Sequence, residues 1–150
     1  MIAEILCVGT EILLGDIVNT NAQYIAKQLA HLGIEVHFQT VVGDNPKRLS
    51  SALNIAMGRA DMVILTGGLG PTKDDLTKEI LAEFFAKPLV LDQKALDMLT
   101  ERLRRRLGAD FVISDSNRKQ AYLPEGALVL YNDNGTAPGC GVEGEIDGQM

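Results

Sequence analysis

An apolar run, a glycine-rich loop and an amphipathic stretch follow one another between residues 62 and 85. The apolar run covers residues 62–65, the loop covers 66–75 with glycines at 67, 68 and 70, and the amphipathic stretch covers 76–85. This order predicts a strand, a tight loop and a helix. It favours an α/β fold in which helices connect parallel strands by right-handed crossovers.

The rest of the chain repeats this alternation. Apolar runs at 2–8 and 34–42 predict two more strands, and a short strand is expected at 127–130. Helical periodicity predicts helices at 22–32, after Pro46, at 76–85 and from Asp92 to Leu107, where Gly108 ends the last one. This last helix is expected to bury four leucines: Leu96, Leu99, Leu103 and Leu107. Since no boundary is visible, the 150 residues are predicted to form one domain.

Charge and composition exclude several classes of protein. The net charge is −6 and the isoelectric point is near 4.8, which argues against nucleic-acid binding. The basic run at 102–106 lies at the end of a predicted helix, where cations are stabilised by the helix dipole and by solvent. We find no signal peptide, no membrane span and no disulfide framework, so we expect a cytoplasmic protein without membrane contact.

The loop at 66–75 has the chemistry of a phosphate site. Its glycines let main-chain N–H groups approach an anion near the start of a helix. Lys73 adds a positive charge, and Asp74 and Asp75 can hold a hydrated Mg²⁺. The alternative is a plain loop in which Thr72 or Asp74 caps the helix. The letters match neither a Walker A sequence nor a dinucleotide fingerprint.

Other polar residues follow the predicted strands. The segment 9–21 is dense in small polar groups, and Asp44 follows the strand that ends near residue 42. Ligands of open α/β sheets bind at the carboxyl ends of the strands, so these residues are candidates for a site. Capping is the alternative, by Asn19 or Thr20 for one helix and by Asp44 or Asn45 for the next. A second glycine-rich loop covers residues 132–139.

Six motifs in order resemble the N-terminal domain of the competence/damage-inducible CinA family, which has the molybdopterin-binding, MoaB/MogA-like fold. They are residues 9–15 (GTEILLG), 19–21 (NTN), 41–44 (VVGD), 66–75 (TGGLGPTKDD), 117–120 (NRKQ) and 135–139 (GTAPG). The resemblance covers essentially the whole chain. It implies a three-layer α/β/α domain with a mostly parallel sheet.

The resemblance also implies an activity and its requirements. CinA-like N-terminal domains are assigned an ADP-ribose pyrophosphatase activity, which hydrolyses ADP-ribose to AMP and ribose 5-phosphate with a divalent metal, Mg²⁺ or Co²⁺, and with K⁺ as a possible assistant. The expected partner is therefore a small nucleotide such as ADP-ribose. Family members are commonly dimers or trimers, so a homo-oligomer is expected. By motif, Asp44 and Asp75 match the aspartates of the adenylyltransferase relatives.

Together these considerations give a set of candidate residues. The catalytic candidates are Asp44, Asp75, Glu11 and Lys73, and the metal candidates are Asp44, Asp74 and Asp75. The candidates for substrate and phosphate binding are Gly9, Thr10, Asn21, Thr66, Gly67, Gly68, Gly70, Thr72, Gly135, Thr136, Pro138 and Gly139.

Two features of the family are absent from these residues. The family continues into a Pro-Gly-Pro-Pro turn that helps to complete the site, and then into a domain that deamidates nicotinamide mononucleotide. We therefore expect a domain truncated at its C-terminal end and do not predict the deamidase reaction. Two alternatives to hydrolysis stay open: a nucleotide- or pterin-binding module without chemistry, and a molybdopterin adenylyltransferase.

Overall fold

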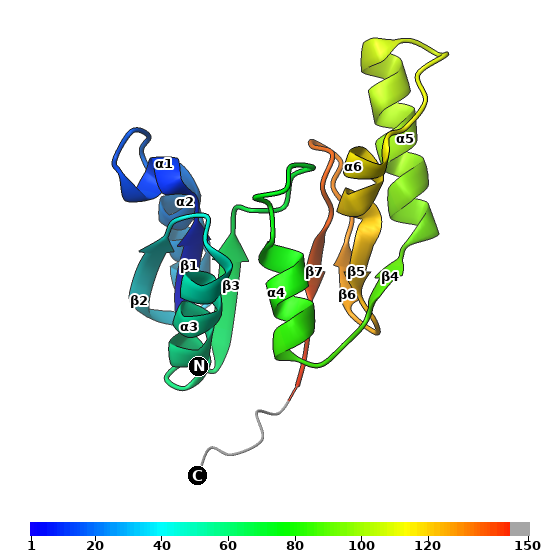
Figure 1. The fold of residues 1–150 in the computed structure, drawn as a ribbon. Coiled ribbons are helices and arrows are strands. Elements are labelled where there is room, and N and C mark those ends of the chain that lie inside the picture. The colour runs from blue at the N-terminus through cyan, green and yellow to red at the C-terminus, as the bar shows by residue number, and fades with distance from the viewer. Residues whose placement is uncertain (145–150) are drawn as a thin grey trace. The chain divides into compact units, whose positions relative to one another are not determined.

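The computed structural model describes residues 1–144 (Figure 1). These residues fall into two compact units, which we call unit 1 (residues 1–68) and unit 2 (the described residues from 69 onward). Each unit has its own strands and helices, so each is described by itself.

Unit 1 is built on a parallel sheet of three strands. They are β1 (Ile2–Val8), β2 (Glu35–Val42) and β3 (Met62–Thr66), in the order β2-β1-β3. In the register, Leu6 lies beside Thr40 on one side and Leu65 on the other. Because all three strands run the same way, their carboxyl ends meet at one edge of the sheet. The parallel sheet predicted from the apolar runs is confirmed.

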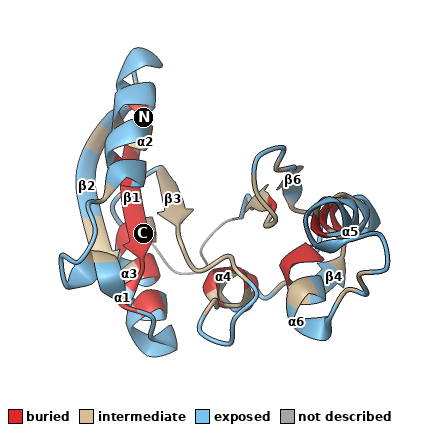
Figure 2. Ribbon diagram, turned by 90° about the horizontal axis from the view of Figure 1, so that it is seen from above, coloured by how far each residue is buried: buried red, intermediate tan, exposed pale blue. Residues whose placement is uncertain are grey.

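Helices cover both faces of this sheet (Figures 1 and 2). The helices of unit 1 are α1 (Thr10–Leu13), α2 (Thr20–His31) and α3 (Pro46–Met57). The face of β1 that carries Ala3, Ile5 and Cys7 packs on α2. On the opposite side, α3 contributes its buried residues Leu49, Leu53 and Ala56. Helix, sheet and helix therefore form three layers, as the family resemblance implied.

Side-chain caps fix where α2 and α3 begin. Asn19 Oδ1 accepts from the Ala22 N–H at 3.2 Å, and Asn45 Oδ1 accepts from the Arg48 N–H at 3.0 Å. Asn19 and Asn45 are thus the caps, in place of the alternatives Thr20 and Asp44. Asp44 is consequently left for other contacts.

Unit 2 combines short strands with one long helix. In chain order its elements are α4 (Thr77–Phe84), β4 (Leu89–Leu91), α5 (Gln93–Leu107), α6 (Asp115–Arg118), the 3₁₀ turn η1 (Lys119–Ala121), β5 (Tyr122–Pro124), β6 (Leu128–Leu130) and β7 (Gly139–Gly141). Strands β4 and β5 form one antiparallel pair, and β6 and β7 form another. No helix in residues 1–144 is long and apolar enough to cross a membrane.

Helix α5 begins as the sequence predicted, with Asp92 Oδ1 accepting from the Ala95 N–H at 2.7 Å. Leu96, Leu99 and Leu103 are buried. Leu107 is 59% exposed, so its predicted burial is wrong. The last turn of α5 runs beyond the strands of unit 2 (Figure 1).

Candidate functional site

The ends of β1 and β2 are joined by two residues that bond in both directions. The Thr10 N–H and hydroxyl donate to Asp44 Oδ2 at 3.0 and 2.9 Å, and the Asp44 N–H donates to Thr10 Oγ1 at 3.1 Å. Gly43 precedes Asp44, and a Cβ there would lie 3.2 Å from Thr10 Oγ1. Both side chains are exposed to solvent. Thr10 and Asp44, which lie in separate sequence motifs, thus form one polar cluster at the carboxyl edge of the sheet.

The end of β3 contributes a glycine turn to the same sheet edge. Gly67 has a φ of +94°, and a Cβ at this position would lie 2.0 Å from the Val8 carbonyl oxygen. Gly68 follows with a φ of +65°. The side chain of Asn21 donates to Thr66 Oγ1 at 3.2 Å. Only glycine fits at residue 67, because the chain turns there directly against the end of β1.

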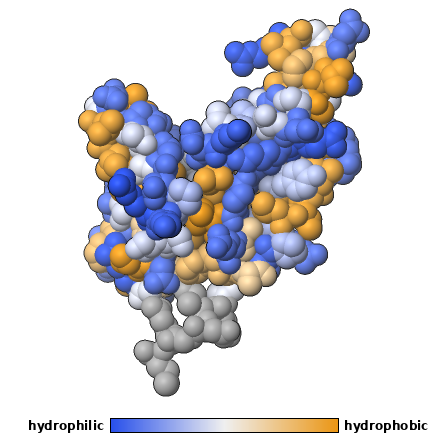
Figure 3. All heavy atoms as spheres, in the orientation of Figure 1, coloured by the Kyte–Doolittle hydropathy of each residue, from blue (hydrophilic) through white to orange (hydrophobic). Residues whose placement is uncertain are grey.

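Helix α1 places a carboxylate and an aliphatic surface beside this edge. The Glu11 side chain folds back on Gly9, where a Cβ would lie 2.9 Å from Glu11 Oε1. The four large aliphatic residues of segment 13–18 are between 48% and 82% exposed; they are Leu13, Leu14, Ile17 and Val18. Figure 3 shows apolar surface at this end of unit 1, and we call these four residues the aliphatic ledge.

In unit 2, Asp75 closes a tight turn of the first glycine loop. Asp75 Oδ2 accepts from the Thr72 N–H at 2.9 Å and from the Thr72 hydroxyl at 2.6 Å. A Cβ at Gly70 would lie 2.7 Å from this oxygen, so any other residue there would displace the Asp75 carboxylate. Burial opposes ionisation of Asp75, but hydrogen bonds from Thr72 and from the Gly70 main chain, with the charge of Lys119, lower its pKa.

The capping alternative for this loop is wrong. Helix α4 begins at Thr77, and its N-cap residue Leu76 makes no side-chain cap. Thr72 bonds Asp75 instead, and the Asp74 and Lys73 side chains are exposed. The turn is therefore held by its own side chains rather than by the helix that follows.

A lysine that the sequence did not single out holds this turn. Lys119 Nζ donates to the Thr72 carbonyl at 2.9 Å and to the Asp75 carbonyl, and it lies 3.3 Å from Glu79 Oε1. The other carboxylate oxygen of Glu79 is buried without a hydrogen-bond partner. The only sequence signal for Lys119 was its place in the 117–120 motif, because its contacts lie 40 or more residues away.

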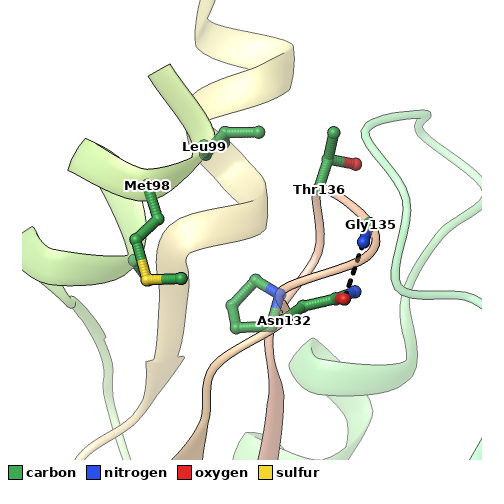
Figure 4. Close-up of a pocket in the computed structure, with 7 residues that line it drawn as sticks. Met98, Leu99, Asn132, Gly135 and Thr136 are labelled. Atoms are coloured by element: carbon green, nitrogen blue, oxygen red, sulfur yellow. Dashed lines mark hydrogen bonds between the residues drawn. The ribbon is translucent and has the colours of Figure 1, made fainter. Parts of the chain in front are cut away.

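The second glycine loop is organised by one asparagine (Figure 4). Asn132 Oδ1 accepts from the N–H groups of Asn134 and Gly135 at 2.9 and 2.7 Å, and its amide donates to the Ala137 carbonyl at 2.9 Å. The Thr136 hydroxyl donates to Gln120 Oε1 at 2.8 Å. A small hollow separates this loop from α5; it is lined by Ala95, Met98, Leu99, Asn132, Gly135, Thr136 and Pro138.

Hydrogen bonds within the second glycine loop occupy groups that the sequence analysis proposed as phosphate-binding candidates. The Gly135 N–H is already donated within the loop, Pro138 has no N–H, and Gly139 belongs to β7. In this conformation the loop therefore serves its own fold. The N–H groups of Thr10 and Asp44 are also bonded within their pair, but both side chains are exposed to solvent, so this pair is the more open candidate.

The described carboxylates do not gather into a metal centre. Within residues 1–144, no three His, Cys, Asp or Glu side chains gather where they could hold a metal ion. A centre made of protein ligands alone does not fit. A hydrated Mg²⁺ needs only one or two carboxylates besides ligand phosphates and water, and the exposed Asp44 carboxylate fits that role.

The sequence and the fold have clear relatives. The profile of the probable molybdopterin binding domain family matches residues 4–149, so the chain belongs to this family. The protein CinA from Thermoplasma acidophilum has the same fold with a TM-score of 0.83 and 34% identity, over 93% of this chain and 80% of that one. MoaB from Thermus thermophilus, a molybdopterin biosynthesis enzyme, shares the fold with a TM-score of 0.54 and 24% identity, over 67% and 62% of the two chains.

Curated relatives agree with this assignment. A putative competence-damage inducible protein of Clostridium kluyveri is 59% identical over 144 residues, and a CinA-like protein of Dictyoglomus turgidum is 59% identical over 143. Each alignment covers 95% of this chain and 34% of the relative. The chain thus spans about a third of the length of these relatives.

Proposed function

We propose that this domain binds a phosphate-bearing ligand of the molybdopterin or nucleotide type at the carboxyl edge of the unit 1 sheet. The observation that carries the proposal is the mutual bonding of Thr10 and Asp44 beside the Gly67 turn. Membership of the molybdopterin-binding family supports the ligand class.

The chemistry of the edge suggests how such a ligand is held. Main-chain N–H groups at strand ends suit phosphate oxygens. A carboxylate repels phosphate, so Asp44 suits hydroxyl or ring N–H donors, or a hydrated Mg²⁺ that bridges to the phosphate. The aliphatic ledge offers an apolar surface for a planar ring. The ring and the donor groups of such a ligand therefore have matching groups in unit 1, and a hydrated Mg²⁺ held by Asp44 would bridge to its phosphate.

Hydrolysis of ADP-ribose to AMP and ribose 5-phosphate is a more specific proposal, in which the bound ligand also reacts. It rests on the resemblance to CinA-like domains, with Asp44, Asp75, Glu11 and Lys73 as the acting residues and Mg²⁺ or Co²⁺ as the metal. Binding takes precedence, because the exposed Asp44 carboxylate offers an acceptor without any reaction being assumed. The Thr10 hydroxyl and the Asp44 N–H hold this carboxylate in place by bonding within the pair. Adenylyl transfer to a pterin is a third possibility for the same class of ligand.

Calorimetric titration with ADP-ribose and with a pterin phosphate, each with Mg²⁺, tests the proposal. The wild type is expected to bind one of them, and Asp44→Asn to bind it at least tenfold more weakly. Asp97→Asn, a change on α5 in unit 2, serves as the matched control and is expected to bind normally. Chromatography of the same samples detects AMP. Binding without AMP supports the binding module, AMP supports hydrolysis, and no binding of either probe contradicts the proposal.

We also propose that the protein works in the cytoplasm as a homo-oligomer. Two unpaired cysteines, the buried Cys7 and the half-buried Cys140, support a reducing compartment. Light scattering tests the oligomeric state, and a stable monomer at micromolar concentration would contradict it.

A further inference from the structure

Gln120 is a buried polar residue with no role in the expected site. Its side chain is 1% exposed, in the 3₁₀ turn η1. Its Oε1 accepts from the Thr136 hydroxyl of the second glycine loop at 2.8 Å. Its amide lies 3.4 Å from the carbonyl and side-chain oxygens of Asn117. A buried glutamine with both ends bonded fixes what it touches, because losing a partner would leave a polar group unpaired.

Lys119, the residue before Gln120, contacts the first glycine loop. Lys119 Nζ donates to the Thr72 and Asp75 carbonyls, the two ends of the turn in the first glycine loop. Two consecutive residues thus extend their side chains to different loops, Lys119 to residues 70–75 and Gln120 to residues 132–139. We call Lys119 and Gln120 the hub.

A buried lysine holds the main chain of the hub. Lys78, on α4, is 3% exposed, and its Nζ donates to the Gln120 carbonyl at 2.5 Å and to the Lys119 carbonyl at 3.4 Å. Burial lowers the pKa of Lys78 to about 8, so the ammonium is still mainly charged at neutral pH. Charged donors make the stronger hydrogen bonds, so Lys78 restricts both hub residues together.

We propose that the hub couples the two glycine loops of unit 2, with Gln120 as the positioning residue through which a change at residues 132–139 alters the turn at 70–75. The contacts form a continuous chain from Thr136 through Gln120 and Lys119 to Thr72 and Asp75. Coupling of this kind is reciprocal, so loosening either loop loosens the other. For ligand binding the idea rests on the proposed function, since it assumes that ligand phosphates reach one of these loops.

Amide hydrogen exchange tests the coupling without any ligand. Thr136→Val removes the hydroxyl bonded to Gln120 and keeps the side-chain shape. It is expected to speed exchange at residues 70–75 roughly five-fold, the effect of losing about one hydrogen bond. Thr136→Ser should restore the wild-type rate. Thr100→Val, which removes a hydroxyl bonded only to its own helix, is the matched control and should leave both loops unchanged.

The reverse experiment uses Lys119→Met, which should speed exchange at residues 132–139. If each variant affects only its own loop, the coupling is overturned. A titration with ADP-ribose separates this inference from the proposed function. If each variant speeds exchange in the other loop but ADP-ribose does not bind, the coupling through the hub is supported and ADP-ribose is contradicted as the ligand. If ADP-ribose binds, the double variant Thr136→Val/Lys119→Met should lose less affinity than the product of the fold-losses of the two single variants. A loss equal to that product would show that the two residues act independently and would contradict the coupling.

Discussion

The Thr10 hydroxyl donates to Asp44 Oδ2 at 2.9 Å and accepts from the Asp44 N–H at 3.1 Å. This exchange ties the end of β1 to the end of β2, two strands whose paired residues end at Val8 and Val42. It also fixes the direction of the Asp44 carboxylate at the sheet edge. The site thus depends on a threonine as much as on the carboxylate.

Thr10→Val is expected to weaken this link. The loss should be about 1 kcal/mol in the free energy of unfolding, because the bonds are exposed and solvent replaces part of each. Thr10→Ser keeps the hydroxyl and should lose less than about 0.5 kcal/mol. Urea denaturation measures both. Equal losses in the two variants would show that the hydroxyl does not hold Asp44.

Gly67→Ala is expected to be severely destabilising. Its Cβ would lie 2.0 Å from the Val8 carbonyl oxygen, and its φ of +94° is strained for any other residue. Gly15→Ala is the matched control, since Gly15 also has a positive φ, +80°, but nothing lies within 4 Å of its Cβ. The control should lose about 1 kcal/mol, and Gly67→Ala several times more. Thermal unfolding at similar temperatures for both would contradict the close approach.

Arg59→Met is expected to expose the cost of a carboxylate buried in the sheet. Glu4 is fully buried in β1 and is bonded by Arg59 at 2.8 Å through both of its oxygens, and Thr40 donates to one of them at 2.6 Å. Removing Arg59 leaves that charge without its main partner. We expect a loss clearly larger than that of an exposed ion pair, because the Glu4 carboxylate is buried, although the Arg59 side chain is 36% exposed.

Arg48→Met is the control for this change, since Arg48 is an exposed residue in the first turn of α3. It should change the free energy of unfolding by no more than about 0.5 kcal/mol. Chemical denaturation of both variants at pH 7 makes the comparison. Losses of similar size would show that the Glu4 pair adds nothing specific to unit 1.

Lys78 makes the stability of the protein depend on pH in a defined direction. Burial lowers its pKa from 10.5 to about 8, with Glu79 and Cys140 opposing the shift and Lys119 adding to it. Between these values the unfolded chain binds more protons than the folded one, so the free energy of unfolding should rise with pH. Wild type should therefore gain stability relative to Lys78→Met, by about 1–3 kcal/mol, as pH rises from 8 to 10.5. Parallel curves for the two proteins would contradict the lowered pKa of Lys78.

The fold of unit 1 could be predicted because its elements are long enough to show a period. Apolar runs and helical spacing located β1, β2, β3, α2 and α3, with ends that differ from the prediction by about two residues. The four-residue helix α1 was not predicted, since it is too short to show a period. In unit 2, β4, β5, β6 and β7 have three residues each, which is too short for an alternating pattern. Of these, only β6 was expected.

The candidate site also contains residues that the sequence predicts and residues that it does not. Glycine loops and strand ends are contiguous in sequence, so Asp44, Gly67 and Asp75 could be named from the letters. Lys119 and Lys78 act through partners about 40 residues away, and no local pattern marks such contacts. The Glu4–Arg59 pair could not be predicted for the same reason: 55 residues separate the two, and Glu4 lies in an apolar run that predicts only a strand.

Mapping a ligand by amide chemical shifts tests the central claim most directly. ¹⁵N-labelled protein is titrated with ADP-ribose and, separately, with a pterin phosphate, each with Mg²⁺. We predict that the amides of Thr10, Gly43, Asp44, Gly67 and Gly68 shift together and saturate with one Kd for at least one probe, and that Asp44→Asn weakens this binding. Shifts confined to other surfaces, or none with either probe, would contradict a ligand site at the carboxyl edge of unit 1.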